Sequence, residues 1–288
     1  MKILKNAPLK NFNFYKIGGA ADEILWIEKI SNFVEIWKNT KLPKLILGGG
    51  SNICFADAGF RGKIFVPKFQ NYFFKKNFCT VESGLPLQKL VEISAAAGFV
   101  DLCELSGIPG NVGGAIRGNA GAKNEISEFL VAVEFCDERG KIQKIAAENC
   151  EFFYRESIFK KKNWAILRGI FQFFKKENPE FLREKIKKIW RDRAKKLPAG
   201  FSAGCVFKNP KNFSAGKILD ELGAKNDFCG DIKISEKHAN FFVNLGSGTQ
   251  QNLLELMRKW RKIAHEKTGI LLEPEIFLCD EFGKKINL

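Results

Sequence analysis

Apolar side chains recur at helical spacing in three stretches of the chain. Residues 86–97 place their apolar positions on one face, and Gly98 follows where helices commonly end on a left-handed residue. Residues 179–196 and 252–267 show the same period, and Gly269 lies just beyond the second of them. We therefore predict three amphipathic helices over these ranges.

Shorter apolar patterns predict strands between the helices. Residues 45–47 form a continuous apolar run that leads into a glycine cluster, as a buried strand does. Residues 131–136 and 141–145 alternate between apolar and polar side chains around a turn at 137–140, which is typical of a β-hairpin. Residues 164–174 form another strand-like run. Because strands and helices are interspersed, the sequence predicts a mixed α and β protein.

Length and composition are those of a globular protein. The chain has 288 residues, of which 45% are hydrophobic and 27% are charged, and this length predicts two domains or three small ones. It contains no run of about 18 uncharged apolar residues, so no membrane-spanning helix is expected. The first residues lack the apolar core of a secretory signal, so we expect a cytoplasmic protein.

The cysteines and histidines exclude several kinds of site. The eight cysteines include no C-x-x-C pair, which argues against a zinc ribbon or a thioredoxin-like centre, and we expect reduced thiols. His238 and His265 are the only histidines, and they lie far apart in sequence. A histidine-rich metal site is therefore excluded, a Ser-His-Asp triad is poorly supported, and we expect no metal.

The sequence is strongly basic. It has 47 Lys and Arg against 32 Asp and Glu, a formal net charge of +15. Such an excess suits nucleic acid, suits anionic small substrates such as nucleotides, or reflects a compositional bias. We favour the bias because Lys is spread through the whole chain. The densest basic stretch, residues 183–196, keeps its apolar positions on one helical face, so we interpret it as a solvated helix surface rather than an RNA-binding helix.

Two glycine-rich loops are the first features that suggest chemistry. One spans residues 47–53, and the other spans 106–116 and continues to 119–121. Glycine lets a ligand approach the backbone closely, and successive N–H groups can hold an anion, so two such loops would suit a pyrophosphate held from two sides. Neither loop fits the Rossmann or the P-loop pattern. Tight turns between strands are the alternative, but the small polar residues in both loops favour anion binding.

These loops resemble the flavin-binding loops of the UDP-N-acetylenolpyruvoylglucosamine reductase family, the MurB-type enzymes of peptidoglycan synthesis. The resemblance runs from about position 12 to the end, in the family's order. The short chain resembles the compact type II branch, which lacks an extra tyrosine-bearing substrate loop. Five further segments resemble family motifs, among them Tyr-Arg-x-Ser and Ala-Gly-Ser-x-Phe-Lys-Asn-Pro: Tyr154–Lys160, Ser202–Pro210, Ala215–Leu219, Lys237–Phe241 and Leu272–Ile276.

The resemblance implies an α+β fold. Two α/β subdomains of the vanillyl-alcohol-oxidase (PCMH) type would hold non-covalent FAD, and a C-terminal α/β domain would bind the UDP-sugar. We expect the boundaries at residues 1–67, 68–195 and 196–288, and leave open that the last residues return to the first subdomain. The residues expected to bind FAD are Gly48, Gly49, Gly50, Ser51, Asn52, Gly107, Ile108, Pro109, Gly110, Gly113, Gly114, Ala115, Asn119 and Gly121.

The resemblance also implies a reaction. NADPH would reduce FAD, which would then transfer a hydride from N5 to the enolpyruvyl group of UDP-N-acetylglucosamine enolpyruvate and so yield UDP-N-acetylmuramate. Arg155 and Glu275 match the family's catalytic arginine and glutamate, which would polarise the substrate carboxylate and stabilise the enolate. Glu273 is the competing carboxylate, and the Glu-Ile position of the motif favours Glu275.

Position 205 departs from the family pattern. Cys205 stands where the family has a serine that protonates the enolate, and a thiol, with an ordinary pKa of about 8.5, can also supply a proton. The alternative is that Cys205 is a small packed residue and that Ser202 or water gives the proton, although Ser202 lies early in the motif. His238 has a place in a motif but no evident chemical role. The positions that match substrate contacts of the family are Tyr154, Lys208 and Asn209.

Two other functions are weighed against this one. Another FAD oxidoreductase of the same fold would explain the glycine loops but would leave Arg155, residues 208–210 and Glu275 without a role. A nucleic-acid-binding protein would explain the net charge, but it calls for exposed aromatics among basic residues, whereas the phenylalanines here lie in apolar runs. We therefore expect a monomeric enzyme whose partners are the UDP-sugar and NADPH, with no nucleic acid and no membrane.

Overall fold

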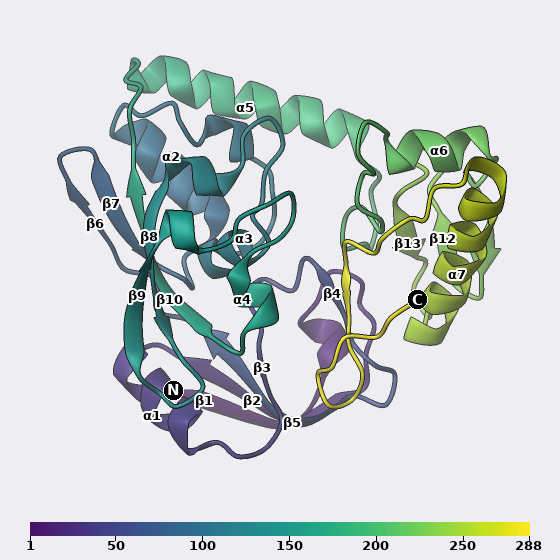
Figure 1. Ribbon diagram of the computed structural model, residues 1–288, viewed down its shortest axis with the longest axis horizontal. Coiled ribbons are helices and arrows are strands. Elements are labelled where there is room, and N and C mark those ends of the chain that lie inside the picture. Colours follow the sequence, from purple (N-terminus) through teal and green to yellow (C-terminus); the bar gives the residue numbers. More distant parts are fainter.

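The structure is a computed structural model that describes residues 1–288, and the N-terminal part is built around a four-stranded sheet (Figure 1). Its elements are β1 (Lys2–Pro8), η1 (Leu9–Asn11), β2 (Ala20–Ile27), α1 (Ile30–Asn39), β3 (Lys44–Ile46) and β5 (Phe60–Pro67). The strand order is β1-β2-β5-β3, with β1 antiparallel to β2 and the other pairs parallel. Because β3 is an edge strand and leads directly into the first glycine loop, that loop lies at this edge of the sheet.

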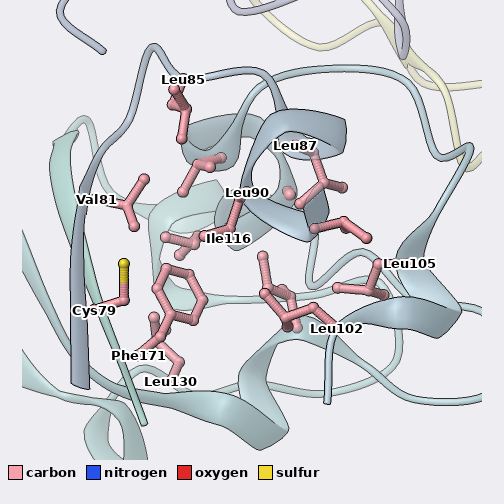
Figure 2. Packing of buried hydrophobic residues seen from close by; sticks show 14 of the residues in the cluster. Cys79, Val81, Leu85, Leu87, Leu90, Leu102, Leu105, Ile116, Leu130 and Phe171 are labelled. Carbon is pink, nitrogen blue, oxygen red and sulfur yellow. The ribbon is translucent and has the colours of Figure 1, made fainter. Parts of the chain in front are cut away.

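The second part is a five-stranded antiparallel sheet with the order β6-β7-β10-β8-β9. Its strands are β6 (Tyr72–Lys75), β7 (Phe78–Glu82), β8 (Leu130–Cys136), β9 (Ile142–Ala146) and β10 (Ala165–Gln172). The helices of this part are α2 (Leu87–Ala96), η2 (Cys103–Leu105), α3 (Val112–Arg117), η3 (Ile126–Phe129), η4 (Ala147–Asn149) and α4 (Ile158–Lys161). Figure 2 shows Val81 and Phe171 of the sheet packed with Leu90 of α2 and Ile116 of α3 in one fully buried core.

A long helix, α5 (Pro179–Lys196), crosses from the second part to the third along the top of Figure 1. The third part consists of α6 (Ala215–Glu221), β11 (Phe228–Cys229), β12 (Ile232–Ile234), β13 (Phe242–Asn244) and α7 (Gln250–Thr268). Its strands form an antiparallel sheet in the order β11-β12-β13. Leu253 and Trp260 of α7 pack with Ile232 and Phe242 of the sheet in a second core.

The chain then returns to its N-terminal part. Strand β14 (Phe277–Leu278) pairs in parallel with β4 (Ile53–Cys54), and Leu278 lies opposite Cys54. In Figure 1 this yellow segment runs from the third part down beside β4. Cys279, which follows, is buried in the N-terminal core. The segment just before β14 is thereby fixed between the first and third parts.

The three helices predicted from periodicity are confirmed as α2, α5 and α7, and their ends follow from local chemistry. Asn178 caps α5 by accepting hydrogen bonds from the backbone N–H groups of Glu180 and Phe181. Thr249 forms a capping box at the start of α7, and Gly269 ends that helix with φ of 73°. The predicted strand before the glycines is confirmed as β3, although its three residues are half-buried rather than buried, and Leu47 just after it is buried.

The predicted hairpin is confirmed as β8 and β9, and the strand-like run at 164–174 as β10. The hairpin turn is held by Asp137, whose Oδ1 accepts hydrogen bonds from the backbone N–H groups of Arg139 and Lys141. These bonds, with one from Gln143, hold the pKa of the Asp137 carboxyl below its usual range.

Each of the three larger sheets lies within one of the three expected domains. Strand β14 pairs with β4, which lies within the first domain. We therefore propose domain divisions at 67/68 and 195/196. None of the helices combines the length and apolar character that crossing a membrane requires. The eight cysteines are free thiols, and no three acidic, cysteine or histidine side chains gather where they could bind a metal ion.

Candidate active site

A cavity of about 530 Å³ lies where the three parts of the chain meet. Its walls include the loop after β3, the loop before α3, the turn before α4, and segments of the third part. It is lined by every predicted site residue except Asn119 and Lys208. Residues separated by more than 200 positions thus share one space of the size that binds a small molecule or cofactor.

The two glycine loops lie against each other along one side of the cavity. The Ser51 hydroxyl donates to the Pro109 carbonyl over 3.1 Å. A Cβ on Gly49 would lie 2.8 Å from the Cα of Gly110, so this close contact of the two backbones requires glycine. Gly50 has φ of 69°, and a side chain there would also collide with the Phe12 carbonyl.

The lining of this side fits a flavin nucleotide. A Cβ on Gly114 would meet no atom of the protein and would project into open space, as expected where a ligand must approach the backbone. Ser83 also lines the cavity, and its Oγ is buried without any hydrogen-bond partner in the protein. Because a buried hydroxyl without a partner is unfavourable, a ligand atom is its natural acceptor or donor. The loops therefore offer backbone groups to FAD, and Ser83, which follows β7 beside them, offers a free hydroxyl.

Arg155 lies in a tight turn between Phe153 and Glu156, which exchange two backbone hydrogen bonds. Its φ of 57° is left-handed, a conformation that is uncommon for residues other than glycine. Its guanidinium makes three bonds: Nε donates to Glu275 over 2.8 Å, Nη2 to the Gly121 carbonyl over 2.8 Å, and Nη1 to the Asn119 carbonyl over 3.4 Å. An arginine has five N–H donors, so two remain free for a ligand.

Glu275 reaches this position because its backbone is held by both flanking parts of the chain. Its N–H donates to the Val206 carbonyl over 2.8 Å, and its carbonyl accepts from Asn52 Nδ2 over 3.2 Å. The Glu275 side chain is 19% exposed, whereas the Glu273 side chain is 72% exposed and lies 3.5 Å from Lys208. Only Glu275 of the two lines the cavity, which supports it as the functional carboxylate.

Cys205 lines the cavity from the loop after α5, directly after Gly204, whose φ is 83°. Burial raises the pKa of the Cys205 thiol to about 12, and the nearby negative charge of Glu275 adds to the rise, while Arg155 and Asn240 oppose it. The thiol is therefore protonated at neutral pH, so it can give a proton but offers almost no thiolate. Ser202, the alternative donor, also lines the cavity.

The Lys237–Phe241 segment supports the Cys205 loop from behind. The Asn240 Oδ1 accepts a hydrogen bond from the Phe207 backbone N–H over 2.9 Å, and its Nδ2 donates one to the Phe207 carbonyl over 2.8 Å. His238 accepts the Asn240 N–H on its Nδ1 over 3.2 Å, and burial lowers the pKa of the imidazole. His238 also borders the cavity, and its hydrogen bond helps to hold Asn240 in place.

The two predicted residues outside the cavity belong to its support. Asn119 is fully buried, and its Nδ2 donates to Glu125 over 2.6 Å and to the Phe153 carbonyl over 2.9 Å. Its side chain is therefore occupied within the protein, and its backbone carbonyl accepts the hydrogen bond from Arg155 Nη1. Lys208 lies 2.6 Å from Glu156, so it joins the third part of the chain to the Arg155 turn.

Tyr154 and Asn209 both line the cavity and approach each other, since the Tyr154 hydroxyl accepts the Asn209 N–H over 3.5 Å. The Tyr154 ring lies 4.9 Å from the Arg155 guanidinium, close enough for a cation–π contact. The Asn209 side chain accepts the Ala215 N–H over 3.0 Å, which leaves its amide N–H groups available.

Sequence reasoning assigned no role to Arg117 or Lys160, although both line the cavity. Arg117 packs over the Phe277 ring at 5.5 Å, and its guanidinium has no ion pair or hydrogen bond within the protein, while burial lowers its pKa. Lys160 ends the Tyr-Arg-x-Ser segment, and its ammonium donates to the Arg155 carbonyl. For Lys160 the only available signal was its place at the end of a motif, and Arg117 lay between two motif segments, without a signal of its own among many basic residues.

Comparisons with known proteins agree with this geometry. Residues 26–146 match the model of an FAD binding domain, which confirms the expected cofactor-binding fold. Residues 195–279 match the model of the UDP-N-acetylenolpyruvoylglucosamine reductase C-terminal domain. The structure resembles the crystal structure of UDP-N-acetylenolpyruvylglucosamine reductase (MurB) from Thermus caldophilus with a TM-score of 0.81 and 33% identity, over 96% of this chain and 98% of that one.

Similar curated proteins extend over almost the whole sequence. UDP-N-acetylenolpyruvoylglucosamine reductase of Aquifex aeolicus is 36% identical over 98% of this chain and 97% of its own. The Clostridium novyi protein of the same name is 32% identical over 97% of this chain and 93% of its own. With this identity and coverage, the chain belongs to the UDP-N-acetylenolpyruvoylglucosamine reductase family.

Proposed function

We propose that this protein reduces UDP-N-acetylglucosamine enolpyruvate to UDP-N-acetylmuramate in peptidoglycan synthesis, with FAD as cofactor and NADPH as electron donor. The observation that carries this proposal is the Arg155–Glu275 ion pair beside Cys205, in a cavity whose other side is formed by two glycine loops. When bound, FAD would accept a hydride from NADPH and then transfer a hydride to the methylene carbon of the enolpyruvyl group.

The free N–H groups of Arg155 would bind the substrate carboxylate. A guanidinium stays charged and can hold a carboxylate by two parallel hydrogen bonds, which stabilises the negative charge that moves onto that group as the enolate forms. Glu275 fixes Nε of the same guanidinium and so sets its orientation. Arg117 adds a second positive charge at the cavity wall, half-buried and without an ion pair of its own.

Cys205 would then protonate the carbon next to the carboxylate. The thiol retains its proton at neutral pH because its pKa is about 12. Burial and the Glu275 charge oppose the thiolate that is left when the proton leaves, and the positive charge of Arg155 partly offsets them. The hydride and this proton together saturate the double bond, and solvent restores the thiol. Tyr154 and Asn209 would contact the nicotinamide or the UDP-sugar.

The test is an anaerobic visible absorption spectrum of the FAD-loaded protein. NADPH should bleach the flavin bands, and the UDP-enolpyruvyl sugar should restore them. Bleaching without recovery would favour a different oxidoreductase of the same fold, and failure to bind FAD after reconstitution would contradict the assignment of the glycine loops. Tight salt-dependent RNA binding without flavin would instead support a nucleic-acid function.

A further inference from the structure

The functional arginine has an unfavourable backbone conformation that its surroundings must maintain. Arg155 has φ of 57°, in the third position of the turn closed by Phe153 and Glu156, where glycine is favoured. Such a conformation is unfavourable and persists only when neighbouring contacts hold it. Three of these contacts are on the guanidinium. The fourth is on the backbone: the Lys160 ammonium donates a hydrogen bond to the Arg155 carbonyl.

Lys160 is itself part of a chain of charges between two parts of the protein. Its Nζ lies 3.6 Å from Glu156, and the same Oε1 atom of Glu156 lies 2.6 Å from Lys208. The Lys208 ammonium also forms an ion pair with Glu273, over 3.5 Å. The cation that holds the Arg155 backbone is therefore anchored, through Glu156, to the segment that carries Glu275.

We propose that Lys160 is a positioning residue that keeps Arg155 in its left-handed conformation and so directs the guanidinium toward Glu275 and the substrate carboxylate. The proposal rests on the function proposed above. It assigns Lys160 an effect on the substrate half-reaction through Arg155, not a contact with the flavin.

The charge on Lys160 should make this effect sensitive to pH. Burial lowers the pKa of its ammonium to about 8, with Arg117 and Lys208 contributing to the fall and Glu156 opposing it. Lys160 is thus charged below about pH 8, and it loses its ion pair with Glu156 as the pH rises through that value. The rate of the substrate half-reaction should accordingly be full below pH 8 and decline above it. Cys205 cannot cause this decline because its thiol pKa is about 12.

The test compares Lys160→Met and Lys160→Arg with Lys161→Met, a matched control. Lys161 is the next residue of α4, 59% exposed, and pairs only with Glu151 on the surface. Stopped-flow absorbance would follow bleaching by NADPH and recovery with the UDP-enolpyruvyl sugar. In Lys160→Met, recovery should slow about 10- to 100-fold, as expected for a misplaced catalytic group, while bleaching and FAD content stay as in the control.

A double-mutant cycle separates positioning from direct binding. In an Arg155→Ala background, Lys160→Met should slow recovery less than about 2-fold further, because the residue through which it acts is gone. Fully additive losses would overturn the proposal and indicate that Lys160 contacts a ligand itself. Lys160→Arg should keep recovery within about 3-fold of wild type at pH 7 and lack the decline near pH 8, since arginine stays charged.

Failure of this inference is distinguishable from failure of the proposed function. If wild-type protein does not recover with the sugar, the proposed function is wrong. If wild type recovers and Lys160→Met recovers as fast as Lys161→Met, the positioning role is wrong. If Lys160→Met does not fold, the pH profile of Lys160→Arg decides, because an unchanged decline near pH 8 contradicts the proposal.

Discussion

Arg155 Nε and Glu275 Oε1 lie 2.8 Å apart although the two residues are 120 positions apart in sequence. The pair joins a turn of the second part to the segment that precedes β14, so it forms only when the first, second and third parts are assembled. Both side chains are about four-fifths buried, which makes their hydrogen bond stronger than a surface ion pair.

Replacement of the two candidate carboxylates should give different results. Glu275→Gln should slow flavin recovery by the UDP-enolpyruvyl sugar about 100-fold, because Arg155 loses the charged partner that orients it. Glu273→Gln should stay within about 3-fold of wild type, since Glu273 forms an exposed pair with Lys208. The reverse order in stopped-flow rates would mean that Glu273 is the functional carboxylate.

Substitution of Cys205 should separate the two half-reactions. Cys205→Ala should still be bleached by NADPH, but recovery with the sugar should slow about 10²- to 10⁴-fold, the usual contribution of a general acid. Cys205→Ser should remain active because a hydroxyl can also give a proton. Unchanged recovery in Cys205→Ala would exclude the thiol as the donor and direct attention to Ser202.

The raised thiol pKa predicts a slow and steeply pH-dependent alkylation of Cys205. With a pKa of about 12, only about one molecule in 10⁴ carries a thiolate at pH 8, and the thiolate is the reactive form. Iodoacetamide labelling, followed by mass spectrometry of the peptide, should accelerate about tenfold per pH unit from 7 to 10. A plateau within that range would show that Arg155 stabilises the thiolate more than burial opposes it.

The helices and strands that position the site were predictable because their signals are local. Amphipathic spacing and the end residue Gly269 identify α7 without knowledge of the fold. The role of Asn119 was not predictable in this way. An asparagine beside glycines suits a ligand equally well, and only the fold shows that its amide is used by Glu125 and the Phe153 carbonyl. The place of Arg117 in the cavity was not predictable for another reason, since one cation does not stand out among 47 basic residues.

Two glycines should respond differently to alanine substitution. Gly49→Ala places a Cβ 2.8 Å from the Gly110 Cα, so the melting temperature of the apoprotein should fall by about 2–10 °C and FAD binding should weaken. Gly114→Ala meets no protein atom, so the apoprotein should melt as wild type while FAD binding weakens. Calorimetry of the apoprotein and fluorescence titration with FAD would measure both. Equal FAD affinity in Gly114→Ala and wild type would contradict contact at that position.

The pairing of β14 with β4 has a consequence for how the protein is made. Asn52, next to β4, donates its side-chain amide to the carbonyl of Glu275, which is synthesised 223 positions later. During translation β4 leaves the ribosome without its partner strand, and it stays unpaired until residues 277–278 have emerged. Contacts of such long sequence separation form slowly. The nascent enzyme should therefore pass through an inactive species with exposed β4 backbone, which is the stage at which a chaperone or aggregation would act on it.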